Sequence, residues 1–140
     1  MPAFLTLNGA VKRDAAIDAW LAALPSDLGS IARRWVAQMR ACGTDVRELM
    51  HDGFATACVE DAPFAYVGAF RAHVNVGFFH GDALMDPAGL LVGVGKNMRH
   101  VKVKPGRGRD GTALEALITA AYRDIVARLK EPERANHAKG

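Results

Sequence analysis

The sequence has few residues at the spacings that enzymes use to activate a nucleophile. Its only two serines, Ser26 and Ser30, have no histidine near them, so we do not expect a serine–histidine pair. Its two cysteines, Cys42 and Cys58, form no Cys-X-X-Cys motif and have no neighbouring histidine to activate the thiol. Isolated cysteines are typical of a reducing compartment, so we expect a cytoplasmic protein. Because no activated nucleophile is found, a non-enzyme is favoured over an enzyme.

Two glycine-rich segments are similar to phosphate-binding loops without matching them. Residues 89–97 have five residues between the flanking glycines where a P-loop needs four, and Asn97 stands where a magnesium-binding Ser or Thr belongs. Residues 106–111 match Gly-X-Gly-X-X-Gly, but only one helix and a short tail remain after them. We therefore predict neither nucleotide hydrolysis nor a dinucleotide-binding fold.

The basic residues gather in the last third of the chain. The net charge is +3, but the residues before Lys96 carry seven Lys and Arg against ten Asp and Glu, and the rest carry eleven against five. Residues 96–109 contain six of these eleven basic residues and no acidic residue. Three interpretations stay open: a solvated sheet edge, a nucleic-acid surface, or a site for a small anion at Lys96, Arg99 and His100. The segment lacks the interleaved aromatic residues that stack on unpaired bases, so a nucleic-acid partner is not expected.

Hydrophobic spacing predicts the helices that would frame these residues. Apolar residues at i, i+3, i+4 and i+7 predict helices over residues 17–24, 28–39 and 114–129, and a short helical turn is expected from Thr44 to Met50. The expected N-terminal caps are Ser26 for the second helix and a capping box from Thr112 to Glu115 for the last.

Short β-branched and aromatic runs predict four strands. They cover residues 54–59, 64–70, 73–79 and 98–104. Because the connections between the first three are short, an antiparallel meander is favoured over parallel strands.

These elements predict one α+β domain. We expect an antiparallel sheet of about four strands with the N-terminal helices and one C-terminal helix packed on one face. Residues 1–129 form this single domain, and residues 130–140 are expected to be a frayed polar tail. No apolar run approaches the roughly 18 residues of a membrane span, and the N-terminus lacks the pattern of a signal peptide.

Pairing Phe70 with His73 divides the meander into two faces. One face is apolar enough to receive the helices and is expected to collect Phe54, Thr56, Cys58, Ala65, Val67, Ala69, Val74, Val76 and Phe78. The second face is expected to collect Ala55, Ala57, Val59, Phe64, Tyr66, Gly68, Phe70, His73, Asn75, Gly77 and Phe79. The second face is either covered, by residues 81–95 or by a second subunit, or forms a shallow pocket with Tyr66, His73 and Asn75 as its polar contacts.

Several segments together resemble a known family. Residues 51–58 (His-Asp-Gly-Phe-Ala-Thr-Ala-Cys), residues 64–79 with Phe-Arg-Ala-His at their centre, and residues 86–91 and 95–102 are similar to the YdhG-like domain-of-unknown-function family. The resemblance covers residues 15–128. It implies a small α+β fold related to frataxin and, because some members are proposed intracellular iron chaperones, iron as a ligand; it does not imply an enzyme.

The sequence thus predicts a small cytoplasmic binding module. In the first hypothesis the sheet face around Tyr66, His73 and Asn75 holds a small ligand, or a metal such as iron whose ligands remain unknown. In the alternative, that face is a homodimer interface and the basic strand meets an acidic partner or an anion. An enzyme acting on an acidic metabolite at Lys96 and Arg99 is a third, weaker interpretation, and no membrane partner is expected.

Overall fold

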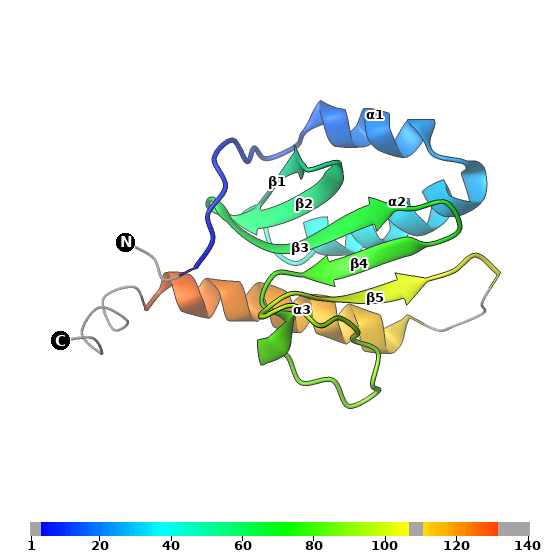
Figure 1. The fold of residues 1–140 in the computed structure, drawn as a ribbon. Helices are drawn as coiled ribbons and strands as arrows, with labels where there is room; N and C mark the ends of the chain where they lie inside the picture. Colours follow the sequence, from blue (N-terminus) through cyan, green and yellow to red (C-terminus); the bar gives the residue numbers. More distant parts are fainter. Residues whose placement is uncertain (1–3, 107–110, 132–140) are drawn as a thin grey trace.

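The computed structural model describes residues 4–106 and 111–131. They form a five-stranded antiparallel sheet in the order β1-β2-β3-β4-β5, with three α-helices and a short 3-10 helix (Figure 1). The elements are α1 (Ala15–Ala23), α2 (Ser26–Arg40), β1 (Val46–His51), β2 (Phe54–Val59), β3 (Ala62–Ala69), β4 (Val74–Phe78), η1 (Gly81–Ala83), β5 (Arg99–Val103) and α3 (Thr112–Leu129). The predicted α+β class and antiparallel meander are confirmed, with five strands in place of about four. The predicted tail lies almost wholly outside the described residues.

The three helices bury their apolar stripes against one face of the sheet (Figure 1). Ile17 of α1, Trp35 of α2 and Ile118 of α3 join Val67 and Val76 of the central strands in a single hydrophobic core. The 3.6-residue spacing of the apolar stripes accounts for this packing, because it places the apolar side chains of each helix on the side that faces the sheet. None of the helices among the described residues is long and apolar enough to cross a membrane.

Two helices begin one residue before the predicted position. Pro25, not Ser26, occupies the N-cap position of α2, and its carbonyl accepts the Gly29 N–H at 2.7 Å. Gly111, not Thr112, occupies the N-cap position of α3. The predicted Ser26 cap and Thr112 capping box are therefore wrong. Pro25 has the non-helical backbone usual at an N-cap (φ −52°, ψ 145°) while its carbonyl accepts the first helical hydrogen bond, so the helix begins at Ser26.

Residues 46–51 form a strand, not the predicted helical turn. β1 pairs with β2 through a two-residue turn at Asp52 and Gly53, which both have positive φ, so that His51 lies opposite Phe54. Asp-Gly is the usual signature of such a hairpin turn, and this was the sequence signal for the missing strand. The residues before this turn have a high helix propensity, so the sequence pattern favoured a helical turn over a strand there.

The helix-facing side of β2 is the reverse of the predicted one. Ala55 and Ala57 belong to the hydrophobic core under the helices. Phe54 and Thr56 lie on the opposite face of the sheet, where Thr56 is paired with Tyr66 of β3. The register of β2 and β3 shifts between Ala57 and Cys58, so that Phe64 has no partner residue on β2. A bulge of this kind moves side chains by one position relative to strict alternation. Phe64 accordingly packs in the core against Tyr122, where the prediction placed it on the second face.

Both outer strands of the sheet are partly paired on their outer side. Val11 forms two backbone hydrogen bonds with Glu48 of β1, at 2.7 and 2.9 Å. Val92 does the same with His100 of β5, at 2.8 and 2.9 Å. Each edge is thus covered at one point by a segment that is not itself a strand.

Candidate functional site

The sheet face opposite the helices carries most of the predicted site residues. The predicted pairing of Phe70 with His73 is confirmed, because the Phe70 N–H donates to the His73 carbonyl at 2.8 Å. Further along the same strands, Gly68 lies opposite Asn75 and Tyr66 opposite Gly77. Strand alternation therefore brings Tyr66, His73 and Asn75 to one face, as predicted. We call this side of the sheet the open face, since all three helices lie on the other side (Figure 1).

Five rings make a continuous row across the open face. Phe54 of β2 stacks on Tyr66 of β3 with centroids 4.9 Å apart and planes 17° apart. Phe70 lies 6.0 Å from Phe54 and stacks on His73 at 5.0 Å and 12°. Tyr66 meets the edge of Phe79 at 5.8 Å. We call these five residues the aromatic row. Its Phe70 end is open to solvent, at 41% exposed, whereas Tyr66 is only 8% exposed.

Two strand glycines make room for this row. A Cβ atom at Gly68 would lie 2.6 Å from the ring of Phe54, and one at Gly77 would lie inside the ring of Tyr66. The Phe54 and Tyr66 rings therefore lie directly over the backbone of the neighbouring strand. A glycine within a strand often marks such a close approach, which gives a physical reason for both glycines.

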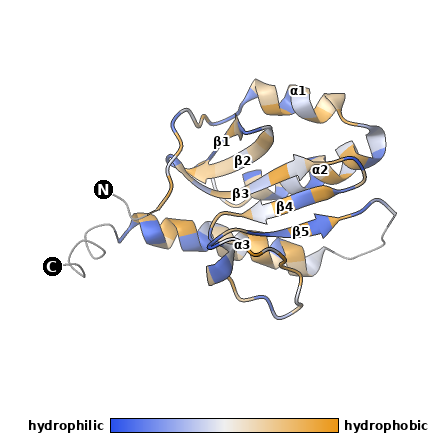
Figure 2. Ribbon diagram, in the orientation of Figure 1, coloured by the Kyte–Doolittle hydropathy of each residue, from blue (hydrophilic) through white to orange (hydrophobic). Residues whose placement is uncertain are grey.

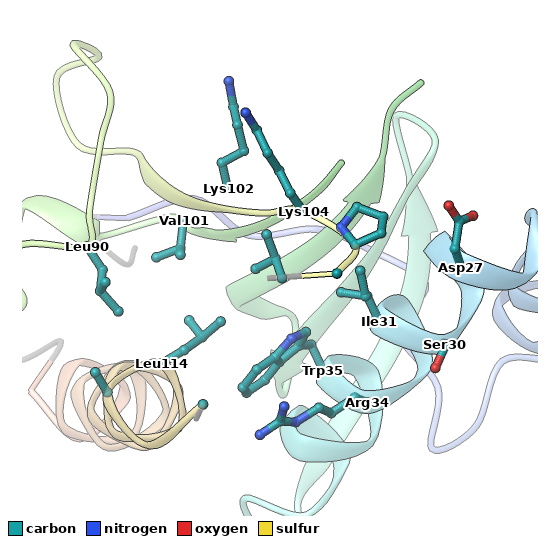
Figure 3. Close-up of a pocket in the computed structure, with 15 residues that line it drawn as sticks. Asp27, Ser30, Ile31, Arg34, Trp35, Leu90, Val101, Lys102, Lys104 and Leu114 are labelled. Atoms are coloured by element: carbon teal, nitrogen blue, oxygen red, sulfur yellow. The ribbon is translucent and has the colours of Figure 1, made fainter. Parts of the chain in front are cut away.

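Strand β5 adds a column of basic residues beside the row. His100 lies opposite Gly77 and Lys102 opposite Asn75, so both belong to the open face. Figure 3 shows the Lys102 and Lys104 side chains on the side of β5 away from Trp35 and Leu114 of the helices. Figure 2 shows that hydrophilic residues concentrate on β5, whereas β2 and β3 are mostly hydrophobic. We call His100, Lys102 and Lys104 the basic column.

The two histidines of the open face are uncharged at neutral pH. Burial lowers the pKa of His73 from its ordinary 6.5, and the positive charges of Lys102 and Lys104 lower it further. Burial, followed by the charge of Lys102, also lowers the pKa of His100. The neighbouring Asn75 amide opposes the shift at His73 because it can accept a hydrogen bond from the protonated ring. No acidic residue lies among the strand residues that pair on this face.

Asn75 has an unused acceptor at the centre of this arrangement. Its Oδ1 atom is buried and makes no hydrogen bond within the described part of the chain, although the ring of His73 is near enough to donate one when it is protonated. A buried amide oxygen without a donor is costly, so a ligand that donates there would be favoured. Asn75 lies between the aromatic row and Lys102.

The structure does not bring Lys96 and Arg99 to His100. Arg99 precedes His100 in the strand and therefore lies on the other face, opposite Phe78 of the core. Its Nη1 atom donates to the carbonyls of Gly95 and Met98, at 2.6 and 2.7 Å. Lys96 lines a separate hollow of about 740 Å³ with His80 and Arg128 among its other residues. The three candidates predicted as one anion site thus lie in different surroundings.

A larger hollow lies between α2, β5 and the start of α3. Its volume is about 870 Å³, and its floor is apolar, with Trp35, Val101 and Leu114 shown in Figure 3. Arg34 lies over the Trp35 ring at 4.4 Å and forms an ion pair with Glu115 at 3.7 Å. Sequence reasoning missed this hollow, because it needs the spacing between two helices that are far apart in the chain.

The cysteines and the acidic residues do not add a reactive centre. Burial raises the pKa of Cys42 to about 11 and that of Cys58 to about 12, so neither thiol is ionised at neutral pH. In the described ranges no group of three or more histidine, cysteine or acidic side chains could hold a metal ion. Asp14 accepts backbone N–H groups of Ala16 and Met50, and Asp18 pairs with Arg40.

No family model, no curated protein and no solved structure matches this chain.

Proposed function

We propose that the protein is a non-enzymatic binding module whose open face holds an anionic ligand with a flat ring. The observation that carries the proposal is the juxtaposition of the aromatic row and the basic column on one acid-free sheet face. Phe70 and His73 offer ring surface, and Lys102 and Lys104 offer charge on the next strand. A nucleotide has both parts: a base that stacks and a phosphate that pairs with lysine.

Iron fits the described residues poorly. Iron bound by oxygen and imidazole ligands needs several converging donors, and the open face offers His73 and His100 without a carboxylate. The lysines beside these histidines also repel a cation. We therefore assign the open face to an anion and derive no iron chemistry for it.

The second candidate function is a homodimer formed through the open face. Phe70 is a large apolar side chain, 41% exposed on a sheet face that no helix covers, and this favours an interface. A two-fold interface, however, sets the same patch of each copy against the other, so both basic columns add positive charge to it and meet no acidic strand residue there. This repulsion favours an anionic ligand over a second copy. Light scattering at micromolar concentration separates the two: the proposal expects a monomer.

Cyclic adenosine monophosphate is the first probe of the proposed function. We expect it to bind and to raise the melting temperature, whereas dimethyl phosphate, with the same single charge and no ring, should bind at least tenfold more weakly. Phe70→Ala should weaken the cyclic nucleotide and leave dimethyl phosphate unchanged. Titration calorimetry and thermal unfolding measure both. Equal affinity for the two probes, or no binding by either, would contradict the proposal.

The affinity for cyclic adenosine monophosphate is expected to increase about three- to tenfold as the pH falls from about 8 to about 5.5. The pKa values of His73 and His100 both lie below 6.5, so the rings are neutral at the higher pH and gain charge only below that value. A bound anion favours the protonated rings, so binding takes up protons. The charge of cyclic adenosine monophosphate does not change over this interval. Affinity independent of pH, measured by calorimetry, would remove the histidines from the site.

A further inference from the structure

We infer that the ligand of the open face is single-stranded nucleic acid, bound by two or more successive nucleotides. The inference rests on the proposed function and extends it from one flat ring to a chain of them. Its basis is that both the aromatic row and the basic column are longer than one nucleotide needs.

The spacing of the rings suits bases that are spread apart. Phe70 and His73 stack on each other at 5.0 Å and together offer one ring surface, whereas Phe54, 6.0 Å from Phe70 and tilted by 52°, offers a second. Stacked bases in a duplex are about 3.4 Å apart along the strand, so successive bases on these rings must separate. An extended single strand separates its bases freely, whereas a base-paired duplex hides the ring faces that stacking needs.

The spacing of the charges fits consecutive phosphates in the same way. Lys102 and Lys104 are two residues apart on an extended strand, a rise of about 6.6 Å. They extend together to one side of β5 (Figure 3). Two cations at this separation can each meet a different phosphate of an extended chain, whereas a mononucleotide presents only one phosphate.

A nucleic-acid partner was not expected from the sequence, because the basic segment lacks aromatic residues, but strand pairing places aromatic residues beside it. The basic segment contains no aromatic residue, but interleaving in the fold does not require interleaving in the sequence. Antiparallel pairing sets Asn75 opposite Lys102 and Val74 opposite Val103, which places His73 beside Lys104. Aromatic side chains of β3 and of the start of β4 thus lie beside the basic side chains of β5, although they are about 30 residues apart in the chain. Several RNA-binding modules use an open sheet face with aromatic residues in this manner.

Fluorescence anisotropy with labelled 12-nucleotide strands of uridine and of deoxythymidine tests the inference. We expect both to bind more tightly than the cyclic mononucleotide, and a 12-base-pair duplex to bind at least tenfold more weakly than either. A preference for the uridine strand would assign a role to the 2′-hydroxyl, and equal binding would assign recognition to base and phosphate alone.

Two variants separate stacking from charge. Phe70→Ala should weaken strand binding about 5- to 150-fold with the salt dependence unchanged, since it removes one stacking ring. The double variant Lys102→Ser with Lys104→Ser should lower the slope of log affinity against log salt by about 1.4, as expected for two lost phosphate contacts. Met85→Ala controls for the loss of a large exposed apolar side chain and Lys12→Ser for the loss of an exposed lysine, because neither residue belongs to a strand of the sheet. Far-ultraviolet circular dichroism checks that each variant is folded.

Three outcomes would overturn the inference. If the cyclic nucleotide binds but the strands bind no more tightly, the proposed function stands and the nucleic-acid inference fails. If duplex and single strands bind alike and Phe70→Ala has no effect, the interaction is only charge attraction, and the inference fails again. If neither the cyclic nucleotide nor any strand binds, both the inference and the proposed function fail.

Discussion

Replacing Glu48 by alanine is expected to lower the free energy of unfolding by about 3–5 kcal/mol, the largest effect of any single substitution considered for this fold. Glu48 is a carboxylate on the helix-facing side of β1 and is only 3% exposed. Its Oε1 accepts from Nε of Arg40 at 2.7 Å, and its Oε2 accepts from Nη2 of Arg40 at 2.8 Å. The Asp14 N–H donates to the same Oε2 at 2.8 Å.

The size of the effect follows from what the substitution leaves behind. Arg40 would keep its charge in a half-buried position and lose a two-point partner, and the Asp14 N–H would lose its acceptor. Glu48 also lies where α1, α2 and β1 meet, so its loss would loosen the edge strand. Hydrogen bonding to Glu48 raises the pKa of Arg40, so the guanidinium is charged at neutral pH.

Urea unfolding followed by circular dichroism measures the change. Asp18→Asn is the matched control, because Asp18 also contacts Arg40, at 3.2 Å, but is half exposed. That variant should change stability by less than about 1 kcal/mol. Glu48→Gln should fall between the two, since the amide keeps one acceptor oxygen. A Glu48→Ala protein as stable as the Asp18→Asn protein would show that the buried pair does not hold the edge of the sheet.

Replacing Gly77 by alanine is expected to cost about 3 kcal/mol and to disrupt the aromatic row. The new methyl group would occupy the space of the Tyr66 ring, which is buried and stacked on Phe54. Overfilling a packed site usually costs about 1–3 kcal/mol, and the upper end applies because neither the ring nor the strand backbone can move freely. Ligand binding should weaken as well, since Tyr66 supports Phe54.

Two other glycines provide the comparison for Gly77. Gly68→Ala should cost less, because the part-exposed Phe54 ring above it can tilt toward solvent. Gly95→Ala should be nearly neutral, since the nearest atom to its Cβ is the Met98 carbonyl oxygen at 3.8 Å. Thermal unfolding and the near-ultraviolet circular dichroism of the aromatic residues measure both effects. Equal stability of the Gly77→Ala and Gly95→Ala proteins would refute the close packing of Tyr66 on the strand.

The sequence pattern was sufficient for the helices and for four strands, because their periodicity follows from burial on one side. It failed at β1 because Glu48 occupies a position where the strand pattern requires an apolar residue. Only the contact with Arg40, which depends on the folded arrangement of α2, makes a carboxylate acceptable there. The bulge at Phe64 was also invisible, because an unpaired residue leaves no mark in a local pattern.

The candidate site was predictable only in part for the same reason. Alternation along β3 and β4 was enough to place Tyr66, His73 and Asn75 on one face. Phe54 was assigned to the wrong face, because the shift between β2 and β3 reverses the sides of β2. Lys102 joins the site through its pairing with Asn75, and a register between strands so far apart in the chain depends on tertiary packing.

The single backbone pairings at Val11 and Val92 have a consequence for aggregation. A sheet that leaves one face free for a ligand gains little if its outer strands can add strands from other molecules. The segment around Val11 occupies one position of the β1 edge, and the segment around Val92 occupies one position of the β5 edge, so a new strand could not pair along either edge without displacing them. The molecule can therefore leave the Phe70 end of the aromatic row exposed while part of the backbone of each outer strand is already paired, which disfavours fibre-like addition of further strands.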